Sequence, residues 1–476
     1  MPRRHLRLRA KDGAELRAGF AKIRSELELP EEFPPEVQAE AEKAAANGEP
    51  TSYGAVEASE LPFLTIDPPG SMDLDQALHV ERRGTGYRVR YAIADVASFV
   101  RPGGAIDQEA NRRVETLYSP DTRTPLHPPV LSEGAASLLP GQTRPALLWT
   151  IDLDAAGEQT GVEVRRAMVR STDRLDYAGV QQSLDSGTAD ERLSLLAEVG
   201  RLREEREVDR GGVSLPIPEQ EVVEQNGSFV LAYRVPLAVE GWNAQISLLT
   251  GMAAADLMLH GEIGVLRTLP TAPPEEIRKL RRAAGVLGVE WPDGTSYAEV
   301  IRDLDPTDPK HLAFLEDATA LLRGAGYTAF DGGVPEQATH AAVAAEYAHA
   351  TAPLRRLVDR YVGEVCVSLC ADTDVPGWVR EALPGLPQRM AESDRRAGAL
   401  ERECVALMEA VVLSPSVGEV FEAAVVDVHE RGGGTVQLRE PAVRGECDGE
   451  LALGERVQVR LAEADVDKRR VRFALA

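Results

Sequence analysis

The sequence predicts an α+β protein in which a large mixed domain is followed by a small β-barrel. Strand-like runs of alternating or continuous apolar residues occupy Leu61 to about Asp154. Helical spacing dominates the middle of the chain, up to Leu413. Short strand-like segments, separated by glycine and aspartate turns, return from Val417 to the C-terminus.

These changes of pattern divide the chain into three regions. A length of 476 residues is enough for two or three domains. We place a helical region at residues 1–58, the large mixed domain at 59–412 and the barrel at 417–476. The stretch Leu413 to Ser416, with a proline between two serines, is a natural linker before the barrel.

The N-terminal region shows two helical patterns. Leu16, Phe20 and Ile23 recur at helical spacing within Gly13 to Glu28, and Pro35 to Ala46 forms a second helix opened by prolines. A helix-turn-helix-like module is one interpretation of this pair. The first residues are basic, with no apolar segment or small-residue cleavage site, so we expect no secretory signal and a cytoplasmic protein.

The large mixed domain begins with strands and continues with helices. Strand patterns cover Tyr87 to Val100, Leu147 to Asp154 and Val162 to Arg170. A second β segment lies among the helices, with a hairpin turn at Asn226–Gly227. The predicted helices are Leu193 to Glu207, Asn243 to His260, Pro274 to Ala284, Lys310 to Leu322 and Leu354 to Leu369.

The C-terminal region has the pattern of a barrel. The segments GEVFEAAVVDVHERGGGTVQL and LGERVQVRLAEADVDKRRVRFAL belong to a series of five short strands. Glycine and aspartate turns separate these strands. Strands at this spacing fit a small OB-type barrel.

Composition excludes several classes of protein. The apolar fraction of 43% and the charged fraction of 27% are typical of a globular chain. There is no run of about 18 apolar residues, so we expect no membrane span. The net charge of −24 argues against a protein that coats nucleic acid non-specifically, although an acidic enzyme can gather basic residues in one channel. The four cysteines form no CxxC pair, which predicts reduced thiols.

Three aspartates are crowded into the stretch TIDPPGSMDLDQAL. Asp73 and Asp75 would project from the same face of a strand, and a turn at Pro68–Gly70 would fold Asp67 back toward them. Three converging carboxylates suit a hard cation such as Mg²⁺, which prefers oxygen ligands. A solvated acidic turn is the alternative for this stretch taken alone.

A second polar motif, YAHATAPLRRLVD, ends at Asp359. We expect Pro353 in the first turn of a helix, with Thr351 as its N-cap. Arg355 and Arg356 then lie in that first turn, where their charge opposes the helix dipole. A phosphate bound by the guanidinium groups would compensate, and ion pairs with carboxylates such as Asp359 are the alternative.

The two motifs resemble the signatures of the RNase II/RNase R family of exoribonucleases, usually TID followed by DxDDA, and YxHFTSPIRRYxD. The segments YAIADV, ETLYSP, SLLP and ALERECVALM resemble further family segments in the same order. The C-terminal region is similar to an S1 RNA-binding domain. The resemblance covers roughly residues 60 to 476 and implies a catalytic domain that encloses an RNA channel.

Carried over by position, the resemblance makes Asp67, Asp73 and Asp75 the catalytic and metal-binding aspartates, with Asp75 the most critical. Arg355 matches the arginine that engages the scissile phosphate, and we group Arg356 with the substrate-binding residues. The implied reaction is Mg²⁺-dependent, processive hydrolysis of single-stranded RNA from the 3′ end, which releases nucleoside 5′-monophosphates.

Two further residues are assigned in the same way. Tyr118 matches the tyrosine that stacks on the 3′-terminal base, a contact that holds any base without reading sequence. Glu401 matches the acidic residue near the terminal nucleotide. Both are expected to bind substrate.

The chain departs from the family pattern in several places. Gln76 stands where the family usually has a fourth aspartate, and it offers a carbonyl oxygen but no charge. Ala352 and Leu357 replace a serine and an aromatic residue. The N-terminal region is helical in pattern, whereas relatives usually carry two cold-shock barrels there.

The leading hypothesis is therefore a monomeric exoribonuclease that acts on single-stranded RNA. Gln76 favours a different class, a catalytically weakened RNA-binding protein on the same scaffold. A third hypothesis is a metal-dependent phosphohydrolase of small molecules. It leaves the S1-like barrel without a function, because such a barrel binds a polymer.

Overall fold

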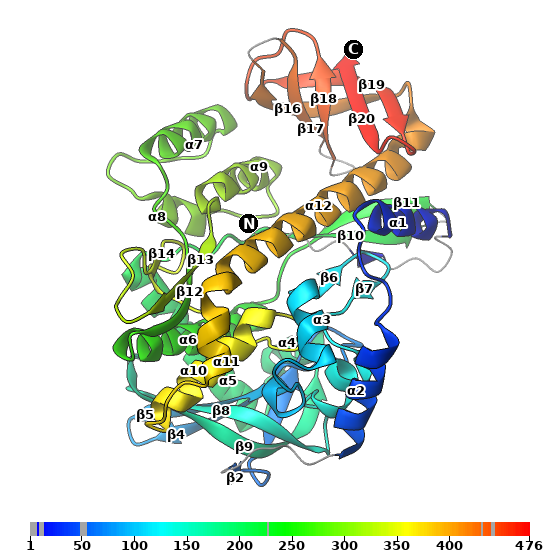
Figure 1. Ribbon diagram of the computed structural model, residues 1–476. Coiled ribbons are helices and arrows are strands. Elements are labelled where there is room, and N and C mark those ends of the chain that lie inside the picture. The colour runs from blue at the N-terminus through cyan, green and yellow to red at the C-terminus, as the bar shows by residue number, and fades with distance from the viewer. Residues whose placement is uncertain (1–6, 9–13, 48–54, 226–227, 430–431, 439–442) are drawn as a thin grey trace.

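The computed structural model describes residues 7–8, 14–47, 55–225, 228–429, 432–438 and 443–476. The architecture is α+β, as predicted, with a curled sheet covered by helices and a separate five-stranded barrel (Figure 1). The long helix α12 (Leu386–Leu413) runs from the helices that cover the sheet to the barrel. The predicted hairpin turn at Asn226–Gly227 lies outside the described residues.

A six-stranded sheet forms the base of the large domain in the order β2-β9-β3-β4-β5-β8. The long strand β9 pairs antiparallel with β8 and parallel with β3, so the sheet curls back on itself. The three strand patterns predicted from the sequence fall in β5, β8 and β9. The strands are β2 (Val56–Glu57), β3 (Phe63–Ile66), β4 (Gln76–Arg83), β5 (Gly86–Ala94), β8 (Thr143–Leu153) and β9 (Gln159–Leu175).

Helices α5 (Glu191–Arg210), α6 (Ala238–His260) and α10 (Leu357–Cys370) share one apolar core with this sheet. Trp149 of β8 is fully buried there, and Trp242 of α6 packs in the same core. Buried residues occur all around α6, which is the pattern of an interior helix.

Of the remaining helices of the large domain, some also contribute side chains to this central core. Helices α7, α8 and α9 build another core, which Val426 of the barrel also joins, and the predicted helix that ends at Leu322 finishes with a 3₁₀ turn. Their bounds, with those of α3, α4 and α11, are α3 (Ala105–Arg113), α4 (Tyr177–Asp185), α7 (Pro274–Leu287), α8 (Tyr297–Arg302), α9 (Pro309–Ala318) and α11 (Gly377–Ala382).

The two predicted N-terminal helices are present as α1 (Ala14–Glu26) and α2 (Pro35–Asn47). They pack on different parts of the fold, α1 against α12 and α2 against α3. Leu16, Phe20 and Ile23, the residues at helical spacing, form the buried face of α1. They join a core that also contains side chains of α12 and the barrel.

The C-terminal strands close into the predicted five-stranded barrel. Arg469 of the barrel pairs with Glu26 of α1 (2.6 Å) and Glu403 of α12 (3.0 Å). Arg444 pairs with Glu316 of α9 (2.7 Å), which joins the barrel to the large domain on a second side. The strands are β16 (Val420–Val428), β17 (Gly434–Leu438), β18 (Arg444–Asp448), β19 (Arg456–Asp465) and β20 (Arg470–Leu475).

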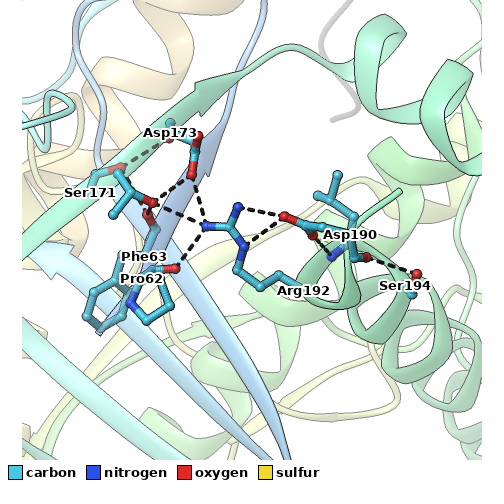
Figure 2. A network of polar contacts seen from close by, with 9 residues as sticks. Pro62, Phe63, Ser171, Asp173, Asp190, Arg192 and Ser194 are labelled. Atoms are coloured by element: carbon cyan, nitrogen blue, oxygen red, sulfur yellow. Dashed lines mark hydrogen bonds and ion pairs between the residues drawn. The ribbon is translucent and has the colours of Figure 1, made fainter. Parts of the chain in front are cut away.

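Arg192, in the first turn of α5, fastens this helix to the sheet (Figure 2). Its guanidinium donates to the Asp190 carboxylate at 2.6 Å, the Asp173 carboxylate at 2.9 Å and the Pro62 carbonyl at 3.3 Å. Asp173 belongs to β9 and Pro62 precedes β3. These contacts hold the strand that leads directly into Asp67.

All four cysteines are free thiols, and Cys366, Cys404 and Cys447 are buried. Within the described ranges, no helix combines the length and the apolar character needed to cross a membrane.

Candidate active site

A cavity of about 1100 Å³ opens beside the β3–β4 loop, the segment after β6 (Leu117–Tyr118) and the starts of α4 and α6. Its lining brings together most of the residues singled out from the sequence. The predicted residues in this lining are Asp67, Asp73, Asp75, Gln76, Tyr118 and Arg355.

The three aspartates lie in a loop, which corrects the expectation that a strand carries Asp73 and Asp75. Strand β4 begins at Gln76, so both aspartates precede it, and Asp67 directly follows β3. The strand begins late because the backbone around Asp73 is bound by a side chain. Ser137 Oγ donates to the Met72 carbonyl (2.6 Å) and accepts from the Leu74 amide (3.0 Å). Alternation along a strand therefore does not set the direction of these carboxylates.

The predicted turn after Asp67 is present. The Ser71 amide donates to the Pro68 carbonyl (3.1 Å), and Gly70 has a φ of 86°, which a residue without Cβ adopts without strain. The Asp67 amide donates to the Leu175 carbonyl at the end of β9 (3.1 Å). This turn returns the chain so that Asp67 lines the same cavity as the two later aspartates.

Asp75 is the most constrained of the three aspartates. Its Oδ1 accepts from the Leu354 amide (2.7 Å), and its carbonyl accepts from the Ala94 amide (2.9 Å). Its Oδ2 lies 3.4 Å from Arg355 Nε. Burial raises the pKa of Asp75 to about 8, although the Arg355 charge and the Leu354 amide act in the opposite direction.

Asp67 and Asp73 have different surroundings. Burial also raises the pKa of Asp67 to about 6, and the negative charge of Asp73 adds to the rise. Asp73 is instead compensated by Arg123, whose Nη1 lies 2.6 Å from Asp73 Oδ1. The other nitrogen of the same guanidinium lies 2.6 Å from Glu133.

The donor chemistry of this loop fits a hard divalent cation. Asp67, Asp73 and Asp75 offer only carboxylate oxygens. Asp75 is buried and Asp67 half-buried, and neither has enough positive charge nearby to keep a normal pKa. In the part of the chain that the structure describes, no three His, Cys, Asp or Glu side chains converge as a metal-binding group. Since Arg123 forms an ion pair with Asp73, the metal site on these three residues stays a prediction.

The arginine motif differs from the sequence expectation in its local structure. Helix α10 begins at Leu357, so Arg355 and Arg356 precede it, and the Thr351 side chain contacts Ser247 (2.7 Å) instead of capping the helix. The helix begins late because Asp359 binds the preceding turn through the Ala352 amide (2.7 Å).

The two arginines of this motif have different partners. Arg355 is 43% exposed and lines the cavity. Arg356 makes a two-pronged ion pair with Asp359, with distances of 2.6 and 2.8 Å. The alternative of an ion pair with Asp359 is thus realised for Arg356, which does not line the cavity. Its role in substrate binding stays a prediction.

Residues 56–369 match the RNB domain. The chain belongs to the RNB family. Residues 419–476 match the C-terminal S1 domain of RNase II-type exonucleases. The predicted boundaries of the three regions, 1–58, 59–412 and 417–476, stay predictions.

Relatives of the RNB chain include ribonuclease R of Escherichia coli (strain K12), which is 27% identical over 485 residues, covering 90% of this chain and 58% of the relative. The human exosome complex exonuclease RRP44 is 27% identical over 334 residues, covering 66% of this chain and 34% of the relative. The chain thus spans somewhat more than half the length of the bacterial relative.

Solved structures share the RNB fold. Mycoplasma genitalium RNase R in complex with ribose-methylated single-stranded RNA superposes with a TM-score of 0.86 at 19% identity, covering 97% of this chain and 78% of that chain. Yeast Ssd1, a pseudonuclease, has a TM-score of 0.67 at 16% identity, covering 86% of this chain and 53% of that chain. At these identities the likeness shows the fold alone.

The two remaining predicted residues of the RNB chain differ in position. Tyr118 is 45% exposed and lines the cavity, and its role in base stacking stays a prediction. Glu401 lies half-buried on α12 and is not among the residues that line the cavity. Its proximity to a terminal nucleotide stays a prediction.

Sequence reasoning missed several residues of the RNB site. Arg123 and Ser137 contact the aspartate loop from segments that approach it only in the folded chain. Tyr91 donates to Gln76 Oε1, and Asn243 donates to the Tyr177 hydroxyl (3.3 Å), which also lies in the cavity wall. The only available signal was the polar character of Tyr91 and Ser137 inside otherwise apolar motifs.

Proposed function

We propose that the chain is a Mg²⁺-dependent exoribonuclease that hydrolyses single-stranded RNA processively from the 3′ end to nucleoside 5′-monophosphates. The observation that carries this proposal is the pairing of buried Asp75 with exposed Arg355, 3.4 Å apart in one cavity. Membership in the RNB family and the relatives called ribonuclease R support it.

Each residue has a physical role in this proposal. Arg355 binds the scissile phosphate and stabilises the charge that develops on it. Tyr118 stacks on the terminal base, which places the last linkage without reading its sequence. The Leu354 amide holds Asp75 in place because its hydrogen bond is buried. Arg355 follows Leu354 directly, so phosphate and carboxylate are positioned by one short segment.

Asp67, Asp73 and Asp75 would hold the divalent cation. When bound, such a cation activates a water molecule and stabilises charge on phosphate oxygens. The barrel supplies a second RNA-binding surface, since OB-type barrels bind oligonucleotides along one face. We expect the protein to act as a monomer in the cytoplasm.

A gel time course on 5′-labelled poly(A) tests the proposal, with Mg²⁺ or EDTA and with the matching DNA as control. We expect the RNA to collapse to a few-nucleotide end product only with Mg²⁺, with little intermediate and with the DNA intact. Asp75→Asn should bind the RNA and leave it whole. Shortening from the 5′ end, or equal loss of DNA, would contradict the proposal.

A second candidate function is RNA binding with weakened catalysis. Two observations favour it: Gln76 replaces an acidic residue, and Arg123 takes up the Asp73 carboxylate. In the same gel experiment this candidate predicts wild-type protein that binds RNA and never shortens it.

A further inference from the structure

Gln76 is the residue at which the site departs from its family pattern, and its side chain has a defined environment. It lines the cavity immediately after Asp75, at the first position of β4. Tyr91 on the neighbouring strand β5 donates its hydroxyl hydrogen to Gln76 Oε1. Tyr91 is buried, with 1% of its surface exposed.

This contact orients the amide of Gln76. The carbonyl oxygen accepts the hydrogen bond from Tyr91. The amide nitrogen has no acceptor among the described residues, and it is not buried. The NH₂ group therefore faces the open cavity. Carboxylates in the same wall favour this orientation, since a carbonyl oxygen turned toward Asp75 would be repelled.

Tyr91 can keep this orientation at any ordinary pH. Its burial, with the nearby acidic side chains, raises the pKa of the Tyr91 hydroxyl well above its usual value, so the group stays protonated and remains a donor. A phenylalanine at this position would leave the amide free to rotate.

We propose that Gln76 is a substrate-binding residue, whose amide N–H donates a hydrogen bond to a non-bridging oxygen of the 3′-terminal phosphodiester. The inference rests on the exoribonuclease function proposed above. A carboxylate at this position would repel the phosphate unless a cation lay between them, whereas the amide binds the anion directly. Gln76 thus replaces a cation-mediated contact with a direct one, and Tyr91 acts as its positioning residue.

The phosphate is the partner that the surroundings favour. Arg355 offers a half-exposed guanidinium to the same cavity, beside Asp75. An anion bound by Arg355 therefore lies next to the Asp75 carboxylate, and Gln76 is the residue that follows Asp75. A neutral donor at this point adds a hydrogen bond without competing for the cation.

The test measures RNA affinity without turnover. The parent protein carries Asp75→Asn, and binding of a short 5′-fluorescein RNA is followed by anisotropy in EDTA. Gln76→Glu keeps the shape of the side chain and its acceptor for Tyr91, but puts an oxygen where the amide nitrogen was. We expect affinity to fall about 10- to 100-fold, the loss expected for one hydrogen bond to a charged group.

Two controls locate the effect. Gln182→Glu makes the same change on the exposed surface of α4 and should leave affinity unchanged. An RNA whose last linkage is an uncharged methylphosphonate should bind the parent more weakly, and Gln76→Glu should then cause little further loss. Tyr91→Phe should lose part of the same affinity, and only with the natural linkage.

Other outcomes would overturn the inference. If Gln76→Glu binds RNA as the parent does, or weakens both RNAs equally, the amide does not contact the terminal phosphate. If it tightens Mg²⁺ binding in calorimetry and leaves RNA affinity unchanged, position 76 faces the cation and not the phosphate. Failure of the proposed function would look different, since wild-type protein with Mg²⁺ would then leave RNA intact in the gel assay.

Discussion

The main-chain amide of Leu354 donates a 2.7 Å hydrogen bond to Asp75 Oδ1, joining residues that are 279 positions apart in the chain. The bond is buried, and Arg355 follows it directly, so the acidic loop and the arginine segment form one unit. A substitution in the acidic loop should therefore alter the position of the arginine segment, and a substitution in the arginine segment should alter the loop.

Arg355→Met should reduce the cleavage rate about 10²- to 10³-fold, because the variant loses a cation aimed at the reacting phosphate. Single-turnover cleavage of labelled RNA at saturating protein measures this rate. Arg82→Met is the matched control, since Arg82 is exposed, pairs with Glu198 of α5 and does not line the cavity. A variant that cleaves at the normal rate once saturated would show that Arg355 acts in binding alone.

Ser137→Ala should loosen the aspartate loop, because the hydroxyl is bound to the backbone on both sides of Asp73. We expect a loss of about 1–3 kcal/mol in the free energy of unfolding in urea, together with slower cleavage under conditions where the variant is fully folded. Ser132→Ala removes another buried hydroxyl, whose hydrogen bonds within the described residues go to the His127 and Pro128 carbonyls. This control should lose stability but keep its cleavage rate, and equal rates in the two variants would refute the positioning role.

Arg123→Gln should tighten the binding of Mg²⁺ several-fold. The guanidinium occupies Asp73 and Glu133, both at 2.6 Å, and its removal leaves two carboxylates without their cation. Calorimetric titration of the RNA-free protein measures the affinity, with Arg82→Gln as control. Weaker Mg²⁺ binding in the variant would instead mean that Arg123 orients Asp73 for the metal.

His127 gives a test based on pH. Burial lowers its pKa to about 3 in the folded protein, whereas an unfolded histidine has a pKa of about 6.5. Below pH 6.5 the unfolded chain therefore binds a proton that the folded chain does not. The stability of the wild type relative to His127→Gln should fall as the pH decreases from about 6.5 toward 3, by at most about 1.4 kcal/mol per pH unit.

Urea unfolding of both proteins at several pH values within this range measures the difference. Using the difference cancels the buried carboxylates, whose raised pKa values act in the opposite direction. A stability difference that is constant with pH would show that His127 titrates alike in both states.

Periodicity predicted the elements of this fold well, and short motifs predicted which residues share the cavity. Apolar alternation located β5 and β8, and helical spacing located α1 and α6. Asp67, Asp75 and Arg355 were predicted because their motifs carry recognisable chemistry, and Tyr118 because its segment resembles one of the family.

The errors arose where a tertiary contact overrides local preference. Thr351 and Pro353 have the pattern of a helix start, but Asp359 binds the Ala352 amide and helix α10 begins only at Leu357. Arg123 acquires its importance from Asp73, 50 positions away, which no local pattern reveals.

The side chains of α1, α12 and the barrel form one continuous apolar core, in which Phe20, Met408 and Phe473 are all fully buried. The barrel is therefore not an appendage that can be deleted cleanly. Its removal would expose the apolar faces of α1 and α12 to water, and these faces would become sites of aggregation. From the same continuity we expect the barrel and these two helices to unfold together, so exchange of this barrel between proteins would have to include both helices.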